Sequence, residues 1–216
     1  MKLKFSTTLQ VLRAEFSRPW RYRLSQRRKY SNIRSVEQLV ERCQDYYPTG
    51  DNLSSLDLGC GKSINNIFLT GDAWGLDIQE IEDSQIICAD LFLNPIPFEG
   101  SRFDFLTAFD FLEHVPRVLV DAGKTRFPFV ELMGEIHRVL RPGGIFLHRT
   151  PAYPAKEAFL DPTHVNLLTE DTFPMYFCSN ALGKRPMASI YGYDGNFELI
   201  EQRWCGCWLV GVMRKI

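Results

Sequence analysis

The chain has 216 residues, enough for one domain with a full hydrophobic core. Hydrophobic residues make up 45% and charged residues 24%, which excludes a fibrous or fully disordered protein. No run approaches the roughly 18 uninterrupted apolar residues of a membrane-spanning helix. The charged N-terminus lacks the apolar block of a secretory signal, so we expect a cytoplasmic protein. The six cysteines show neither metal-ligand spacing nor a disulfide framework.

The net charge of −1 conceals a strong asymmetry along the chain. Residues 1–34 hold ten basic side chains and one acidic side chain, for a net charge of +9, and the remainder carries −10. A basic segment of this kind suits contact with phosphates, with an anionic lipid surface or with the acidic body of the same protein. A short helix is predicted in it before Pro19.

The first regular element of the body is a helix predicted from Ser35 to about Tyr46. Ser35 is a favourable N-cap, and Gln38 three residues later completes a capping-box pattern. Further along, Thr169 is the expected N-cap of a helix that continues to Tyr176.

Apolar segments after residue 50 alternate with helical or loop segments. A helix is predicted over Phe129–Leu140, and it ends at an Arg-Pro-Gly-Gly sequence. Strands separated by crossovers indicate a parallel sheet with both faces covered, whereas the tight connection between the last two strands indicates a hairpin. The predicted strands are Ser54–Leu58, Ala73–Ile78, Gln85–Cys88, Phe103–Phe109, Ile145–Thr150, Phe197–Trp204 and Cys207–Lys215.

Polar and glycine residues follow three successive strands. Gly59 and Gly61 form a turn after the first strand, where the backbone can approach a ligand closely. Asp77 ends the second strand, where a carboxylate can accept hydrogen bonds from both hydroxyls of a ribose. Asp90 ends the third strand and could accept from an adenine amino group. The dinucleotide pattern G-x-G-x-x-G fails because its third position is Ile64.

With these residues in place, the sequence resembles the class I S-adenosylmethionine-dependent methyltransferases. The resemblance implies an α/β fold, a Rossmann-like three-layer sandwich with a seven-stranded, mostly parallel sheet whose last strand is antiparallel. It covers about residues 53–215 and rests on LDLGCG (56–61), GLDI (75–78), ADLF (89–92), FDFLTAFDFLEHVPR (103–117), RVLRPGG (138–144) and the terminal hairpin.

The resemblance also implies the cofactor, S-adenosyl-L-methionine, and the residues that bind it. These are Asp57, Gly59, Cys60 and Gly61 near the methionine part, Asp77 at the ribose, Asp90 and Leu91 at the adenine, and Phe109 near the sulfonium. Ile78, which follows Asp77, belongs to the same cofactor-binding set. Two departures stand out. Ser63 replaces the third glycine of the usual D-x-G-x-G-x-G run, and only about a dozen residues separate Gly61 from the second strand. We therefore expect a very short first helix.

The candidate catalytic residues lie after the fourth and fifth strands. If residues 110–114 form one helical turn, Asp110, Glu113 and His114 share a face. His164 follows the fifth strand and could enter the same cleft. In one interpretation, His114 or His164 is a general base oriented by a carboxylate. His148, inside the fifth strand, is interpreted as a core histidine with hydrogen-bond partners.

In a second interpretation, Asp110, Glu113, His114 and His164 bind a divalent metal ion that holds the acceptor oxygen. This set resembles the E-x-x-E-H pattern of ubiquinone-pathway O-methyltransferases and small-RNA 2′-O-methyltransferases, with Asp110 in place of the first glutamate. The shorter side chain of Asp110 favours the metal-free interpretation.

These observations predict a basic N-terminal helical arm and lid over residues 1–50 and a methyltransferase domain over residues 51–216. The predicted reaction is O-methylation of a small polar or glycan-like acceptor. Two alternatives stay open: an RNA methyltransferase that uses the basic arm, and a non-catalytic cofactor-binding domain. The acidic body disfavours a nucleic-acid partner. Contact of residues 1–34 with an anionic surface and a homodimer are compatible with the sequence.

Overall fold

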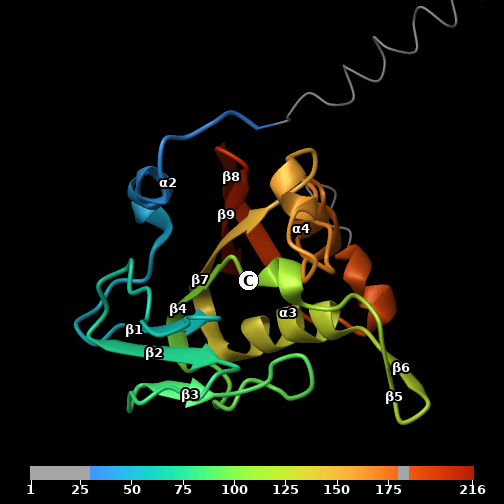
Figure 1. Ribbon diagram of the computed structural model, residues 1–216. Helices are drawn as coiled ribbons and strands as arrows, with labels where there is room; N and C mark the ends of the chain where they lie inside the picture. The colour runs from blue at the N-terminus through green and yellow to red at the C-terminus, as the bar shows by residue number, and fades with distance from the viewer. Residues whose placement is uncertain (1–29, 180–184) are drawn as a thin grey trace, which may run out of the picture.

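The computed structural model describes residues 30–179 and 185–216, and a seven-stranded sheet lies at its centre (Figure 1). The strands lie in the order β3-β2-β1-β4-β7-β9-β8. β9 runs antiparallel to both of its neighbours, and the other pairs are parallel. The predicted sheet with an antiparallel last strand is thus confirmed. The strands are β1 (Ser54–Leu58), β2 (Asp72–Asp77), β3 (Ile86–Cys88), β4 (Phe103–Phe109), β7 (Leu140–Pro151), β8 (Phe197–Cys205) and β9 (Trp208–Lys215).

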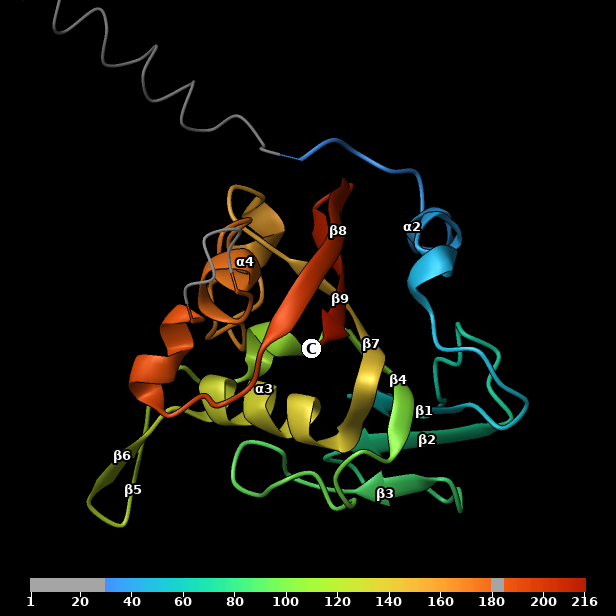
Figure 2. The ribbon, with the colours of Figure 1, turned by 180° about the vertical axis from the view of Figure 1, so that it is seen from behind.

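Helices cover both faces of the sheet, with α2 (Val36–Arg42) on one side and α3 (Pro128–Val139) and α4 (Thr172–Tyr176) on the other (Figures 1 and 2). A small hairpin of β5 (Leu119–Asp121) and β6 (Lys124–Arg126) projects from the body. Among the described residues, no helix combines the length and the hydrophobicity that crossing a membrane requires. The 3-10 helices are η1 (Gln44–Tyr46), η2 (Leu112–His114), η3 (Lys156–Phe159) and η4 (Met187–Tyr191).

Local sequence signals explain where the helices begin. The Ser35 hydroxyl accepts from the Gln38 N–H at 3.4 Å, and the Gln38 side chain accepts from the Arg34 N–H at 3.0 Å, one residue before the N-cap. The predicted capping box is therefore nearly complete. α3 buries side chains at helical spacing, each of which stabilises the fold by about 1.5–3 kcal/mol. These are Phe129, Leu132, Met133, Ile136 and Val139.

The crossover between β1 and β2 differs from the sequence prediction. A very short helix was expected there, but residues 59–71 form only turns and irregular structure. The Asn66 side chain holds this segment by accepting from the Thr70 N–H at 3.0 Å and donating to the Thr70 carbonyl at 2.9 Å. The Phe68 ring stacks on Phe105 at 4.2 Å and Tyr47 packs edge-on against both rings. These aromatic rings cover the sheet face that a helix would otherwise cover.

Two other boundaries also shift. β7 begins at Leu140 rather than Ile145, because Leu140 already pairs with Phe103 across a register irregularity. α4 begins at Thr172 with Asp171 as its N-cap, so the prediction of Thr169 as the N-cap is wrong. The Thr169 hydroxyl instead accepts from the Asp171 N–H at 3.3 Å, in the turn just before the helix. The predicted helix before Pro19 lies outside the described residues.

Candidate active site

A cleft of about 590 Å³ opens at the carboxyl ends of β1, β2, β3 and β4. This is the edge at which parallel α/β sheets bind their ligands. The cleft contains five of the nine residues predicted to bind the cofactor. Its lining residues are Gly59, Leu76, Asp77, Ile78, Gln79, Ala89, Asp90, Leu91, Phe92, Asp110, Phe111, His114 and Thr163.

The turn after β1 requires glycine for two reasons. Gly59 has a φ of +68°, and a Cβ built there would lie 2.7 Å from the Phe111 ring. Gly61 has a φ of +59°, and its N–H donates to Asp77 Oδ2 at 2.8 Å. Asp77 Oδ1 accepts from the Gln79 N–H at 2.9 Å. Asp77 therefore joins the glycine turn to the end of β2 while its carboxylate lines the cleft, where its further lone pairs can accept more hydrogen bonds.

The third strand end supplies both a polar and an apolar wall. Asp90 Oδ1 accepts from the Phe92 N–H at 2.9 Å, which fixes the turn after β3. Leu91 lies beside it in the lining, and the Ile78 side chain across the cleft is 60% exposed. A large apolar side chain exposed at a cleft is suited to contact with a flat ring system.

The remaining predicted cofactor residues do not line the cleft. Asp57 is only 4% exposed and lies beneath the turn, where it accepts from the Thr107 hydroxyl at 2.6 Å and the Asn65 N–H at 2.8 Å. Burial raises the pKa of Asp57 to about 6, and it raises the pKa of the Cys60 thiol to about 12. Phe109 packs with the hydrophobic cluster beneath α2. Asp57 thus supports the turn that carries Gly59 and Gly61.

The segment after β4 makes a shorter turn than predicted, the 3-10 helix η2, so Asp110 lies outside the turn that carries Glu113 and His114. Asp110 precedes η2 with a φ of +50° and forms an ion pair with Arg149. Glu113 is 1% exposed and accepts from the Thr150 hydroxyl at 2.9 Å. Burial raises the pKa of Glu113 to about 7, more than the Thr150 hydrogen bond and the backbone lower it.

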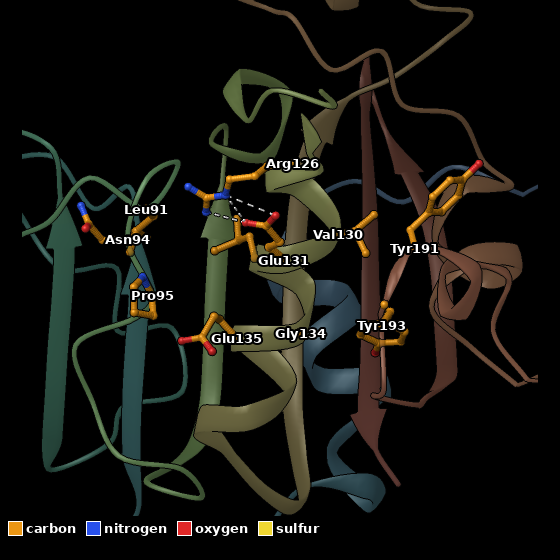
Figure 3. Close-up of a pocket in the computed structure, with 12 residues that line it drawn as sticks. Leu91, Asn94, Pro95, Arg126, Val130, Glu131, Gly134, Glu135, Tyr191 and Tyr193 are labelled. Atoms are coloured by element: carbon orange, nitrogen blue, oxygen red, sulfur yellow. Dashed lines mark hydrogen bonds and ion pairs between the residues drawn. The ribbon is translucent and has the colours of Figure 1, made fainter. Parts of the chain in front are cut away.

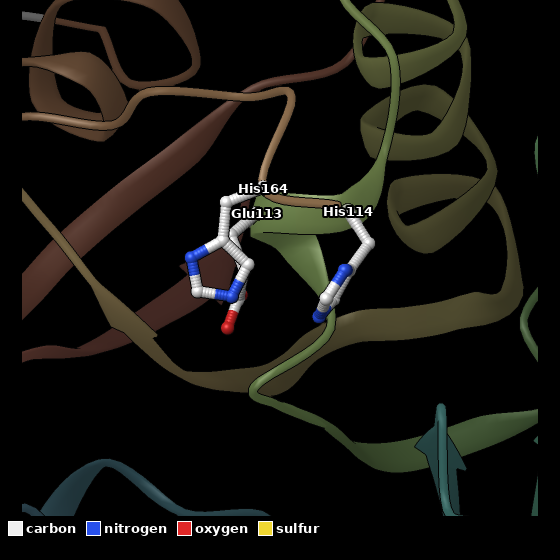
Figure 4. A group of neighbouring side chains, drawn as sticks. All are labelled: Glu113, His114 and His164. Carbon is white, nitrogen blue, oxygen red and sulfur yellow. The ribbon is translucent and has the colours of Figure 1, made fainter. Parts of the chain in front are cut away.

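Glu113, His114 and His164 form a cluster, in which each offers a ligand atom within 4.8 Å of the others. The two imidazole rings lie 4.9 Å apart between centroids at an interplanar angle of 76° (Figure 4). The structure thus brings together three of the four predicted catalytic residues, and the fourth, Asp110, is held by Arg149.

A chain of hydrogen bonds that sequence reasoning missed orients His114. The Thr163 hydroxyl donates to Asp161 Oδ1 at 2.6 Å and lies 3.0 Å from His114 Nδ1. Because the single hydroxyl hydrogen goes to Asp161, Thr163 accepts from Nδ1–H, which leaves Nε2 as the basic nitrogen. The signal in the sequence was Asp161-Pro-Thr163, a pattern that favours a side-chain-supported turn.

Asn166 fixes the loop that carries His164 against η2. Its N–H donates to the Glu113 carbonyl at 2.9 Å and its side-chain amide donates to the Leu112 carbonyl at 3.0 Å. The Arg117 guanidinium in turn donates to Asn166 Oδ1 at 2.8 Å. The loop after β7 is therefore held where His164 meets His114.

A second cavity, of about 330 Å³, lies along the outer face of α3 (Figure 3). Its walls include Tyr191, Tyr193 and the ion pair between Arg126 and Glu131, whose closest atoms are 2.5 Å apart. Leu91 lines both this cavity and the cleft. The histidine cluster does not reach it, so the cleft is the candidate reaction site.

Comparisons with known proteins agree with this geometry. Residues 20–177 match the methyltransferase domain family. A solved S-adenosylmethionine-dependent methyltransferase from Mesorhizobium loti shares the fold with a TM-score of 0.52 at 17% identity, covering 81% of this chain and 96% of its own. A solved structure described as a putative methyltransferase from Bacillus halodurans gives a TM-score of 0.51 at 19% identity, covering 76% of this chain and 71% of its own. No curated protein matches the sequence.

The [4+2]-cyclase SpnF shares the same fold, with a TM-score of 0.51 at 12% identity over 86% of this chain and 85% of its own. A shared fold therefore does not specify a reaction, and the family match carries the assignment. That match covers well over half of the sequence and includes the whole cleft. The chain belongs to the methyltransferase domain family and is an S-adenosylmethionine-dependent methyltransferase with a Rossmann-like fold.

Proposed function

We propose that the protein transfers a methyl group to a hydroxyl oxygen of a small polar or glycan-like acceptor, with His114 as the general base. The observation that carries this proposal is the hydrogen-bonded series Asp161–Thr163–His114 at the wall of the cleft. This series supports the tautomer in which Nδ1 carries the hydrogen and Nε2 can accept a proton. A hydroxyl acceptor needs such a base because its proton must leave as the oxygen attacks.

The donor set of the cleft fits S-adenosylmethionine. Asp77 and Asp90 offer carboxylates at two successive strand ends, and Ile78 and Leu91 offer apolar contact between them. When bound, the cofactor supplies an electrophilic methyl group on a positively charged sulfur. In the part of the chain that the structure describes, the lining contains three aspartates and no lysine or arginine, so its electrostatic potential favours a cation.

The contribution of this chain to the reaction is alignment and proton transfer. The glycine turn and Asp77 hold one reactant, and the loop fixed by Asn166 shapes the other side. Alignment of two reactants can supply several kcal/mol of rate enhancement, and a well-placed base adds roughly 10²–10⁴-fold. In this role, His114 Nε2 would accept the proton of the acceptor hydroxyl as its oxygen attacks.

The cluster Glu113–His114–His164 supports a second role for the same residues, as ligands of a divalent metal ion. Two imidazole nitrogens and a carboxylate suit a first-row transition metal. Such an ion would supply positive charge beside the acceptor oxygen. Asp110 does not belong to this set, because it pairs with Arg149. The two roles differ in one observable, the effect of a chelator.

An acceptor screen with the full chain tests the proposal. Hydroxylated sugars, sugar phosphates and hydroxylated carboxylates are incubated with S-adenosylmethionine, and release of S-adenosylhomocysteine is measured with and without EDTA. We expect acceptor-dependent release that survives EDTA, and nuclear magnetic resonance of the product should locate the methyl group on oxygen. Methylation of nitrogen or carbon, or release only without EDTA, would contradict the proposal.

A further inference from the structure

Arg149 occupies an unusual position at the carboxyl end of β7. Its guanidinium lies over the rings of Phe109 and Trp208, 5.0 and 5.3 Å from their centroids. It forms an ion pair with Asp110, a lining residue of the cleft. The Arg149 side chain is 30% exposed, so it meets solvent beside the cleft. The two rings hold the planar group in place without using its N–H donors.

The hydrogen-bonding capacity of Arg149 is only partly used. A guanidinium has five N–H donors, and the ion pair with Asp110 engages one terminal nitrogen. Its Nε is buried and has no hydrogen-bond partner among the described residues. A ligand cannot reach this buried Nε, but the side chain is 30% exposed and the ion pair engages only one terminal nitrogen, so N–H donors of the terminal nitrogens remain available to another acceptor group.

Charge points to the kind of group that would fill this place. Among the described residues, the cleft lining has three aspartates and no basic side chain other than histidine, so this lining would repel an anionic molecule. Arg149 supplies the positive charge next to this wall, through its contact with Asp110. Planar guanidinium groups bind carboxylates and phosphates with paired hydrogen bonds.

We propose that Arg149 binds an oxyanion of the acceptor, a carboxylate or a phosphate, and that Asp110 holds the guanidinium until this group arrives. The inference rests on the proposed function, because it names the substrate class of the same site. It makes Asp110 a competitor of the acceptor rather than a base. In this arrangement the aromatic rings of Phe109 and Trp208 orient the guanidinium.

Binding of three probes tests this inference without turnover. Glucuronate, glucose 6-phosphate and glucose are titrated by nuclear magnetic resonance into the full chain saturated with S-adenosylhomocysteine. We expect the wild type to bind at least one anionic probe tenfold or more tightly than glucose, and R149Q to lose that preference. R149K should keep part of it. Whichever anion binds distinguishes a carboxylate from a phosphate.

Two further variants sharpen the test. R214Q is the matched control, because Arg214 likewise pairs with a carboxylate, that of Glu198, and lies over the ring of Tyr46, but at the opposite end of the parallel strands. It should bind the probes as the wild type does. D110N removes the competing carboxylate and should tighten binding of the anionic probe by at least threefold, whereas an ion pair with a merely structural role would give no gain.

Equal preference for glucose and the anions in the wild type, an unchanged preference in R149Q, or an equal loss in R214Q would overturn the inference. Weaker anion binding in D110N would overturn it as well. Failure of the proposed function would give a different result, because that function concerns turnover. The protein would then show the expected preference for anionic probes but no acceptor-dependent release of S-adenosylhomocysteine.

Discussion

At the scale of single residues, the Asp77 carboxylate accepts two hydrogen bonds from the backbone and is predicted to accept further ones from the ligand. It accepts from the N–H groups of Gly61 and Gln79 and also lines the cleft. We predict that Asp77→Ala weakens S-adenosylmethionine binding by about 1.5–3 kcal/mol, the scale of a lost charge-assisted hydrogen bond. Titration calorimetry measures this directly.

Asp83→Ala is the matched control for that experiment. Asp83 also accepts from a backbone N–H, that of Gln85 at 2.9 Å, but it is absent from the cleft lining. It should leave the affinity unchanged. An Asp77→Ala variant that binds the cofactor as tightly as the wild type would refute the role of Asp77 at the ribose.

Thr163 is a positioning residue for His114. Thr163→Val removes the hydroxyl that joins His114 to Asp161, so the imidazole loses its fixed tautomer and orientation. We predict a roughly tenfold lower kcat for acceptor methylation, with recovery in Thr163→Ser. Steady-state rates of S-adenosylhomocysteine release by the wild type and the two variants test this prediction. Equal kcat values for Thr163→Val and the wild type would show that the hydroxyl does not orient the base.

The sequence was enough to predict which strand-end residues line the cleft. It was not enough to predict the hydrogen bonds and ion pairs that join the catalytic candidates to distant residues. Gly59, Asp77 and Asp90 meet in one cleft because parallel strands end at the same edge. The ion pair between Asp110 and Arg149, and the contact of His114 with Thr163, join positions 39 and 49 residues apart. Such contacts depend on how long loops fold back, for which the chain carries no periodic signal.

At the scale of elements, β7 carries an unusual core residue. His148 is fully buried, its ring stacks on Phe173 at 3.8 Å, and neither ring nitrogen has a hydrogen-bond partner among the described residues. A core histidine was predicted, but the predicted partners are absent from this part of the chain. Burial lowers the pKa of His148 from 6.5 to about 3.

This burial predicts a pH-dependent stability. The unfolded chain binds a proton at His148 below pH 6.5 and the folded chain does not, so stability falls as the pH falls from 6.5 towards 3. Asp57 and Glu113 act oppositely, because burial raises their pKa values. These two groups are common to the wild type and a His148→Leu variant, so they cancel in the difference between them.

We therefore predict that His148→Leu gains about 2 kcal/mol relative to the wild type between pH 7 and pH 5. Any constant cost of the smaller side chain cancels in this comparison. Urea unfolding at several pH values measures the difference, which should be flat above pH 7.5. A difference that stays constant down to pH 5 would show that His148 is protonated in the folded protein.

Elements with strong periodicity were predictable, and the crossovers were not. β1 and β4 match their predicted bounds, because β1 ends where the glycine turn begins and β4 is rich in aromatic and aliphatic residues up to Phe109, after which Asp110 follows. The connection after β1 has no helix, since its form depends on Phe68 reaching Phe105 across the sheet face. Thr169 resembles an N-cap in sequence, but Asp171 occupies that place once the preceding turn forms.

At the scale of the whole molecule, the basic N-terminal segment is joined to the ligand edge of the sheet. The Ile33 N–H donates to the Trp204 carbonyl at 2.7 Å, and the Trp204 N–H donates to the Ser31 carbonyl at 3.2 Å. Trp204 lies at the carboxyl end of β8, which runs parallel to β7. The segment of net positive charge is therefore attached at the edge where the acceptor would bind.

Removal of residues 1–29 should thus separate two functions. We predict that the truncated protein binds S-adenosylhomocysteine within about twofold of the full chain, because the cleft is built from residues 59–163. Its kcat/KM for an anionic acceptor should fall and depend less on salt, as expected for the loss of electrostatic attraction. Kinetics at two ionic strengths test this, and loss of cofactor binding would contradict it.

The most direct test of the central claim is a single-turnover methyl-transfer measurement with EDTA-treated protein, on an acceptor from the screen. The claim is that His114 acts as a metal-free base in an S-adenosylmethionine-dependent O-methyl transfer. It predicts product formation at the untreated rate, and a rate at least about 100-fold lower in His114→Ala with unchanged cofactor affinity. An unchanged rate in His114→Ala, or a rate abolished by EDTA and restored by a divalent ion, would contradict it.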